Sequence, residues 1–355
     1  MPKNKFSKIS SIIKDAKKGK MFILVDDKNR ENEGDLIIPA SKCNSKSINF
    51  MAKHGRGLIC LALTKKQVDN LKLPLMSSVN KSRMQTAFTI SIEAKKGITT
   101  GISAQDRAKT IKTAINPNVK KSSIVSPGHV FPLVARNGGV LERAGHTEAS
   151  VDISKLSKLN PSSVICEVMN EDGRMARLND LFKFSKKHKI KLASIEDLIS
   201  YRFKYEKLVK RIISKSSNIK KVGKVNIYIY KNKLDNNINL AITKGEFNQK
   251  KSIPVRVLSN KIENKSIISN KNIKKSLIVM SKYKNFLLLI INNKNNIAKE
   301  NSINTLRYYG IGAQIIKDLN IRNMILISRS KKKIIGLDGF GLKIKKQIII
   351  KWKKF

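Results

Sequence analysis

The chain has 355 residues, and its 73 Lys and Arg against 25 Asp and Glu give a formal net charge of +48. With 41% hydrophobic and 28% charged residues it has the composition of a globular protein, and its length suggests two domains. Its longest strictly apolar run, FLLLII at 286–291, is too short to span a membrane, and the first residues lack the uninterrupted apolar segment of a secretory signal. The three cysteines have no CxxC spacing, which excludes a disulfide framework and a Cys-rich zinc site and favours a reducing, cytoplasmic location.

Short strands and helices alternate over the first two hundred residues. This mixture, joined by short loops, predicts a layered α+β domain. Strands are predicted at 22–25, 57–63, 88–92 and 163–169, and helices at 6–16, 104–115, 147–160, 178–188 and 194–212.

The composition changes near residues 205–220. Beyond this point strand-like apolar runs, namely NIYIY, LIVM, FLLLII and MILI, are separated by tracts rich in Lys and Asn. We therefore predict a first domain over residues 1–207 and a second, α/β domain over residues 208–355.

The high positive charge invites a nucleic-acid-binding interpretation. The excess of Lys and Arg runs through both parts of the chain, aromatic residues make up only 6%, and no RNP-like run or zinc-finger spacing occurs. A Lys-rich solvated surface is the simpler interpretation, and no dedicated nucleic-acid partner is expected.

The densest polar cluster is DDKNRENEGDLI at 26–37, which places five carboxylates within ten positions between two apolar runs. Packed carboxylates repel one another unless a cation neutralises them. With Gly34 permitting a tight turn, this segment is a candidate Mg²⁺ site, and a solvated acidic turn is the alternative.

Four other segments combine polar side chains with glycines or apolar runs. RAGHTEA at 143–149 suggests an anion site at the start of a helix, and TTGISAQDRAKTI at 99–111 has the same character. PGHVFPL places His129 in a Gly-containing loop, and ICEVMNEDG places Glu167 in an apolar strand where an unpaired carboxylate is costly. Capping boxes, a satisfied core histidine and an edge-strand glutamate are the structural alternatives.

Taken in order, these segments resemble the 3,4-dihydroxy-2-butanone 4-phosphate synthase family of riboflavin biosynthesis. The resemblance covers roughly residues 8–205 and rests on several long motifs in register. The matching segments are DDKNRENEGDLI, GRGLICLALT, TAFTISIEAKKGITTGISAQDRAKTI, PGHVFPLVARNGGVLERAGHTEASVD and ICEVMNEDGRMAR.

The resemblance implies a role for each matching residue. Glu31 and His146 match the family's Mg²⁺ ligands, and a histidine ligand also leaves room for Mn²⁺. His129 and Glu167 match two positions essential for catalysis. The positions that match substrate contacts are Arg30, Glu31, Asp35, Arg143, Ala144, Gly145, His146, Thr147 and Glu167.

The implied reaction converts ribulose 5-phosphate to 3,4-dihydroxy-2-butanone 4-phosphate and formate. It begins with removal of a carbon-bound proton next to a ketone, so it needs a Lewis acid and positioned proton donors and acceptors. The sequence leaves the division of these proton-transfer roles among Asp35, His129 and Glu167 open. The resemblance also implies a layered mixed-sheet fold and a homodimer.

The second part resembles GTP cyclohydrolase II at 306–327 and 332–344, with Ser328 and Lys333 where that family contacts GTP. That family holds zinc with three cysteines, but the last cysteine of this chain is Cys166. We therefore expect a degenerate cyclohydrolase-like domain without bound zinc. The rival hypotheses are a bifunctional synthase and cyclohydrolase, and a basic RNA-binding protein that retains a fossil enzyme domain.

Overall fold

The computed structural model describes residues 5–249, 251–260, 270–292, 302–330 and 340–350. The chain separates into two compact units, Met1–Ile199 and Ser200–Phe355. None of the described helices is long and apolar enough to cross a bilayer.

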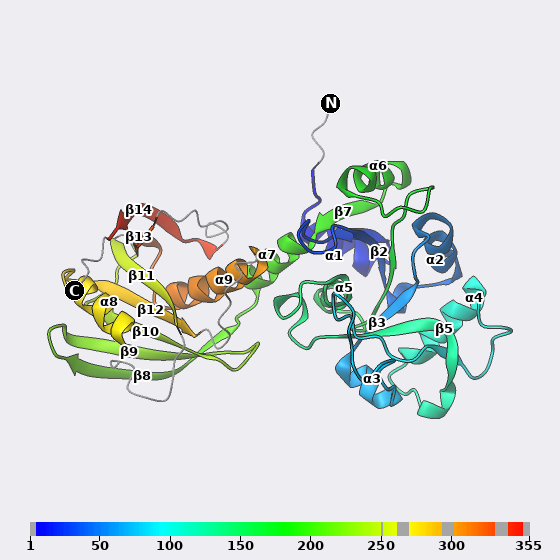
Figure 1. Cartoon of the computed structure of the whole chain (residues 1–355), viewed down its shortest axis with the longest axis horizontal. Coiled ribbons are helices and arrows are strands. Elements are labelled where there is room, and N and C mark those ends of the chain that lie inside the picture. The colour runs from blue at the N-terminus through cyan, green and yellow to red at the C-terminus, as the bar shows by residue number, and fades with distance from the viewer. Residues whose placement is uncertain (1–4, 250, 261–269, 293–301, 331–339, 351–355) are drawn as a thin grey trace. The chain divides into compact units, whose positions relative to one another are not determined.

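The first unit alternates strands and helices (Figure 1). Its elements are α1 (Ile9–Lys17), β1 (Phe22–Val25), β2 (Gly34–Pro39), η1 (Ala40–Lys42), α2 (Ser45–Phe50), η2 (Met51–Gly55), β3 (Cys60–Thr64), α3 (Lys65–Leu71), β4 (Ile92–Ala94), α4 (Ala104–Ala114), η3 (Lys121–Ser123), β5 (Ile124–Ala135), η4 (Gly139–Leu141), α5 (His146–Leu156), β6 (Ser163–Glu167), α6 (Leu178–His188), β7 (Lys191–Ser194) and α7 (Ile195–Tyr205), which extends past the division between the units.

The strands of the first unit form one mixed sheet. Among the described residues it has seven strands in the order β4-β5-β3-β6-β2-β1-β7, with β3 parallel to β5, β1 parallel to β7 and the other neighbours antiparallel. The α+β class and the mixed sheet predicted from the sequence are confirmed.

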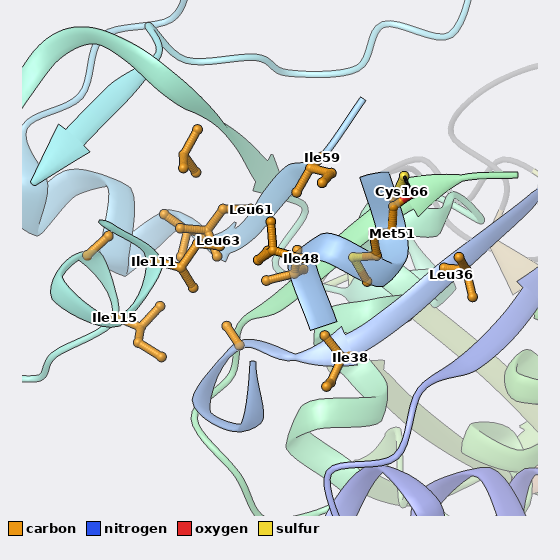
Figure 2. Close-up of a cluster of buried hydrophobic side chains, with 14 of the residues drawn as sticks. Leu36, Ile38, Ile48, Met51, Ile59, Leu61, Leu63, Ile111, Ile115 and Cys166 are labelled. Atoms are coloured by element: carbon orange, nitrogen blue, oxygen red, sulfur yellow. Dashed lines mark hydrogen bonds between the residues drawn. The ribbon is translucent and has the colours of Figure 1, made fainter. Parts of the chain in front are cut away.

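Alternate residues of each strand face opposite sides of this sheet, and helices cover both. On one side Leu36, Leu61 and Cys166 join a hydrophobic cluster with Ile48 of α2 and Ile111 of α4 (Figure 2). The opposite side holds α5, which contacts β1, β2, β3, β5 and β6.

Helix α5 carries serines where it meets the sheet. Ser154 Oγ donates to the Ser162 carbonyl at 3.0 Å and lies 2.8 Å from Ser163 Oγ. Ser163 Oγ in turn donates to the carbonyl of Ser150 at 2.9 Å. Because these buried hydroxyls bond to one another and to backbone, a polar helix is accommodated inside the unit.

The second unit contains β8 (Val209–Ile219), β9 (Gly223–Asn232), β10 (Ile238–Lys244), β11 (Ser252–Asn260), α8 (Lys271–Met280), β12 (Phe286–Asn292), α9 (Ser302–Asp318), β13 (Asn323–Ser328) and β14 (Lys343–Ile349). Its described strands form a second mixed sheet in the order β14-β13-β11-β12-β10-β9-β8. Helix α8 packs on β11 and β12, where Leu277 and Met280 join Leu288 and Ile290 in the core.

Several predicted elements match the structure closely. Strand β1 and helix α6 have the predicted bounds. Serine side chains cap the starts of two of the helices. Ser103 Oγ accepts from the Asp106 amide at the start of α4, and Ser194 Oγ accepts from the Asp197 amide at the start of α7.

The residues predicted to contact GTP are only partly described. Ser328 ends β13. Lys333 and most of the 332–344 match lie outside the described residues.

Four local predictions are wrong. The strand predicted at 88–92 begins only at Ile92, and the helix predicted over 194–212 ends at Tyr205 and is followed by β8. The LIVM run lies in helix α8 and not in a strand. His129 lies within strand β5 rather than in a loop.

Candidate active site

The acidic loop between β1 and β2 is organised around the buried carboxylate of Asp26. It accepts hydrogen bonds from the backbone amides of Glu31 at 3.1 Å and Glu33 at 2.9 Å, and it pairs with Arg30 at 2.8 Å. Arg30 also bonds the Glu31 carboxylate. The loop is therefore held together by its own charged side chains rather than left as a solvated turn.

Arg177, just before α6, holds the same loop through its backbone. Its guanidinium donates to the carbonyls of Glu31 at 2.8 Å and Asn32 at 2.7 Å, and it lies 3.6 Å from the Glu33 carboxylate. Asn32, with a φ of +55°, makes the turn, while the predicted turn residue Gly34 already belongs to β2. No local sequence pattern points to Arg177, because its partners are far away in the chain.

Two predicted site carboxylates lie side by side on the sheet. Asp35 of β2 pairs in register with Glu167 of β6, on the side opposite to the cluster that contains Leu36 and Cys166. Asp35 is buried, and Glu167 Oε2 accepts a hydrogen bond from the Leu58 amide at 2.9 Å. Neighbouring side chains on one face of a sheet are about 5 Å apart, so the two carboxylates repel unless a proton or cation lies near.

His146 supplies positive charge at this point. It is the first residue of α5, and packing of that helix on the sheet brings Nδ1 to 3.7 Å from both Glu31 Oε2 and Asp35 Oδ1. The ring is buried, and its Nε2 has no hydrogen-bond partner among the described residues. The structure thus brings Glu31, Asp35 and His146 together as one cluster.

The pKa values of this cluster reflect burial and mutual charge. Burial raises the pKa of Asp35, and the neighbouring carboxylates of Glu167 and Glu31 add to this rise. Burial alone would lower the pKa of His146, but Asp35 and Glu31 raise it to about 9. Burial opposes ionisation of Glu31, but the nearby imidazole of His146 and the charge of Arg30 bring its pKa to about 2. Asp35 and His146 are therefore placed to share a proton between them, and Glu31 is the carboxyl suited to remain an anion.

A separate group at the start of α5 has the character of an anion site. The N-cap residue Gly145 offers no side-chain cap to the first-turn amides, and both Thr147 in that turn and the preceding Ala144 are buried. Arg143 donates to Glu148 Oε2 at 2.7 Å, which holds its guanidinium next to the helix start. A helix N-terminus with an adjacent guanidinium suits a phosphate or carboxylate.

His129 is placed apart from this cluster, in β5. Its Nδ1 contacts the carboxylate of Glu93 in β4, and no sequence pattern points to a role for Glu93. In the sheet order, β3 separates β5 from β6, so His129 and Glu167 lie two strands apart, about 10 Å across the sheet. His129 is therefore not brought into direct contact with Glu167.

A cation site is compatible with these residues. Ligand atoms of Asp26, Glu31 and His146 lie within 4.8 Å of one another, close to the ~4.2 Å that separates opposite ligands of Mg²⁺. Asp26 already accepts three hydrogen bonds, so it serves the loop more than a metal. Glu31 remains ionised, and His146 has an orphaned ring nitrogen, so the predicted ligand pair fits a divalent cation.

Comparison with known families gives two matches along the chain. The sequence profile of 3,4-dihydroxy-2-butanone 4-phosphate synthase matches residues 10–201, and that of GTP cyclohydrolase II matches residues 279–349. The riboflavin biosynthesis protein RibBA of Aquifex aeolicus is 43% identical, with 98% of this chain and 93% of that protein covered. A 3,4-dihydroxy-2-butanone 4-phosphate synthase of Photobacterium phosphoreum is 42% identical, with 95% and 98% covered.

Solved structures agree with these matches. The crystal structure of RibBX, a two-domain 3,4-dihydroxy-2-butanone 4-phosphate synthase from A. baumannii, has a TM-score of 0.81 at 36% identity, covering 98% of this chain and 100% of that one. A 3,4-dihydroxy-2-butanone 4-phosphate synthase in complex with two magnesium ions has a TM-score of 0.54 at 38% identity, covering 56% of this chain and 98% of that one. The chain therefore belongs to the 3,4-dihydroxy-2-butanone 4-phosphate synthase family.

Proposed function

We propose that this chain converts D-ribulose 5-phosphate to L-3,4-dihydroxy-2-butanone 4-phosphate and formate, as a carbon–carbon lyase of riboflavin biosynthesis. The observation that carries this proposal is the cluster of Glu31, Asp35 and His146 beside Glu167. It offers a permanent anion, a carboxyl with a raised pKa and an imidazole at one buried place. Proton transfer next to a ketone needs groups of this kind.

Other residues of the chain bind the substrate phosphate and transfer protons. Arg143, Gly145 and Thr147 bind the substrate phosphate at the start of α5, so binding energy remote from the reaction positions the reacting carbons. Asp35 and Glu167 hold and move protons as the carbon skeleton rearranges, together with His129.

Glu31 and His146 would hold a divalent cation, which would supply the Lewis-acid character needed to polarise the ketone and its neighbouring hydroxyls. We assign Mg²⁺ to this role, with Mn²⁺ as a substitute, since the donor set combines a carboxylate with an imidazole. The related synthase that contains two magnesium ions supports a divalent metal.

Glu31→Gln should lower formate release at least ~10²-fold, because the neutral amide is a poorer ligand and several kcal/mol of charge stabilisation depend on the metal. The fold should persist, since Glu31 lies in a partly exposed loop. Formate assays with added Mg²⁺ test this, and EDTA should abolish the wild-type rate until Mg²⁺ is restored.

The matched control is Glu33→Gln, which removes a carboxylate from the same loop. The Glu33 carboxylate lies 3.6 Å from the Arg177 guanidinium. We expect its rate to stay within a few-fold of wild type. Equal losses in the two variants, or full wild-type activity in EDTA, would contradict the metal assignment.

Metal binding should release a proton near neutral pH. Because the pKa of His146 is raised to about 9, its ring is protonated at pH ~7 and must lose that proton before a nitrogen can bind a cation. Apparent Mg²⁺ affinity should therefore increase with pH, by up to about tenfold per unit, until the pH exceeds that pKa. Calorimetric titration in buffers of different ionisation enthalpy measures the proton, and a heat independent of the buffer would contradict this predicted proton release.

We also propose that the protein is a homodimer through the first unit. Val125, which pairs with Glu93 next to His129, is exposed, and so is Leu58, whose amide binds Glu167. Met76 adds further exposed apolar surface in the same unit. Exposed apolar groups close to functional residues are typical of surfaces that a second chain covers.

Sedimentation velocity should therefore give twice the chain mass at micromolar concentration. Met76→Lys should weaken association because it places a charge in the covered surface, whereas Ile278→Lys, at an exposed position of α8, should leave it unchanged. A wild-type monomer at high concentration would overturn the dimer.

The second unit, we propose, lacks cyclohydrolase chemistry. Residues 167–355 contain no cysteine, although thiolates hold the zinc of that family. The cyclohydrolase profile still matches residues 279–349, which supports a retained fold.

Purified protein should accordingly bind no stoichiometric zinc and release no formate from GTP, while ribulose 5-phosphate yields formate. Metal analysis together with formate assays on each substrate measures both activities in one preparation. Zinc at about one atom per chain, with formate released from GTP, would favour the bifunctional alternative.

A cytoplasmic location is the last part of the proposal. Cys43, Cys60 and Cys166 are free thiols, and burial raises the pKa of each. Free thiols are typical of proteins in a reducing compartment.

A further inference from the structure

A second carboxylate–imidazole contact lies at the β4–β5 edge, away from the His146 cluster. His129 Nδ1 contacts Glu93 Oε1, and the two residues come from neighbouring antiparallel strands. The Glu93 side chain is only 15% exposed, whereas the His129 side chain is 45% exposed. The carboxylate is therefore the enclosed member of the pair, and the ring is the accessible one.

Two glycines pack closely against the Glu93 side chain, so that a Cβ atom at either position would clash with it. A Cβ on Gly101 would lie 1.6 Å from Glu93 Oε1, and a Cβ on Gly128 would lie 2.4 Å from Glu93 Cγ. Gly101 has a φ of +93°, and its amide donates to the Asp106 carboxylate, which fixes the loop before α4. Two separate chain segments thus enclose Glu93 next to His129.

We propose that Glu93 is a positioning residue that orients His129 and fixes its tautomer. A carboxylate can only accept a hydrogen bond, so Nδ1 is the protonated nitrogen of the neutral ring, and Nε2 is left as the free base. A carboxylate that orients an imidazole in this way recurs in sites where histidine transfers protons. The inference rests on the proposed function, in which His129 transfers a proton.

The contact itself can be tested without activity. The chain has only four histidines, so selective ¹⁵N labelling gives few ring signals, and His129→Gln identifies those of His129. Wild type should show the Nδ1–H tautomer for His129. In Glu93→Ala that tautomer should lose its dominance, while the signals of His54 and His188 stay unchanged as internal controls. An unchanged His129 tautomer in Glu93→Ala would overturn the inference.

The kinetic test uses formate release. Glu93→Ala should lower kcat by about 10–100-fold with KM within about threefold, because a residue that orients another affects the reacting step more than binding. Glu93→Gln keeps an acceptor for Nδ1–H, so it should retain the tautomer and recover most of the lost rate. Glu142→Gln, which removes an exposed carboxylate of the same unit, is the control for charge alone and should keep the wild-type rate.

A double-variant cycle separates positioning from a merely structural role. If Glu93 acts through His129, the double variant Glu93→Ala/His129→Ala should be no slower than His129→Ala alone. Additive losses would mean that Glu93 acts independently, which overturns the inference while leaving the proposed function intact. Normal formate release by His129→Ala would count against the proposed role of His129 and, with it, against Glu93 as its positioning residue.

Discussion

The main constraint on the candidate site is the repulsion between two carboxylates, which the fold holds next to each other and which the surrounding groups must offset. Pairing of β2 with β6 sets Asp35 beside Glu167 on a covered sheet face. The raised pKa of Asp35 expresses this cost, because burial and neighbouring anions favour its protonated form. The positive charge of His146 at the start of α5, 3.7 Å from Asp35, offsets part of this cost, so the helix and the sheet are electrostatically coupled.

Most of the candidate site residues can be identified from the sequence, but fewer of the contacts between them can be. Motifs identify Glu31, Asp35 and His146, and their grouping follows from the β1–β2 loop and the start of α5. Motifs do not identify the roles of Glu93 and Arg177, because their contacts join segments far apart in the chain and leave no local pattern. Such contacts arise from the order of strands in the sheet, which hydrophobic periodicity does not reveal.

Two of the wrong local predictions have identifiable physical causes. A short apolar run does not distinguish a buried strand from a buried helix face, so LIVM predicts a strand although the Asn270 cap starts a helix before it. Conversely, the helical pattern after Ser194 continues past Tyr205, where the chain instead pairs with β9 as β8. After Tyr205, tertiary pairing between strands overrides the local preference for a helix. At the LIVM run, the side-chain cap of Asn270 favours a helix over a strand.

The serine bonds of α5 have a consequence for how the site meets its substrate. Hydroxyls of Ser154 and Ser163 tie the middle of the helix to the strand that ends at Glu167, so the helix cannot slide along the sheet without breaking buried bonds. The imidazole and the first-turn amides therefore keep their place before any ligand arrives. If an anion binds at the start of α5, as we propose, it would meet dipoles that are already oriented, and little of its binding energy would be spent on reorganising the protein.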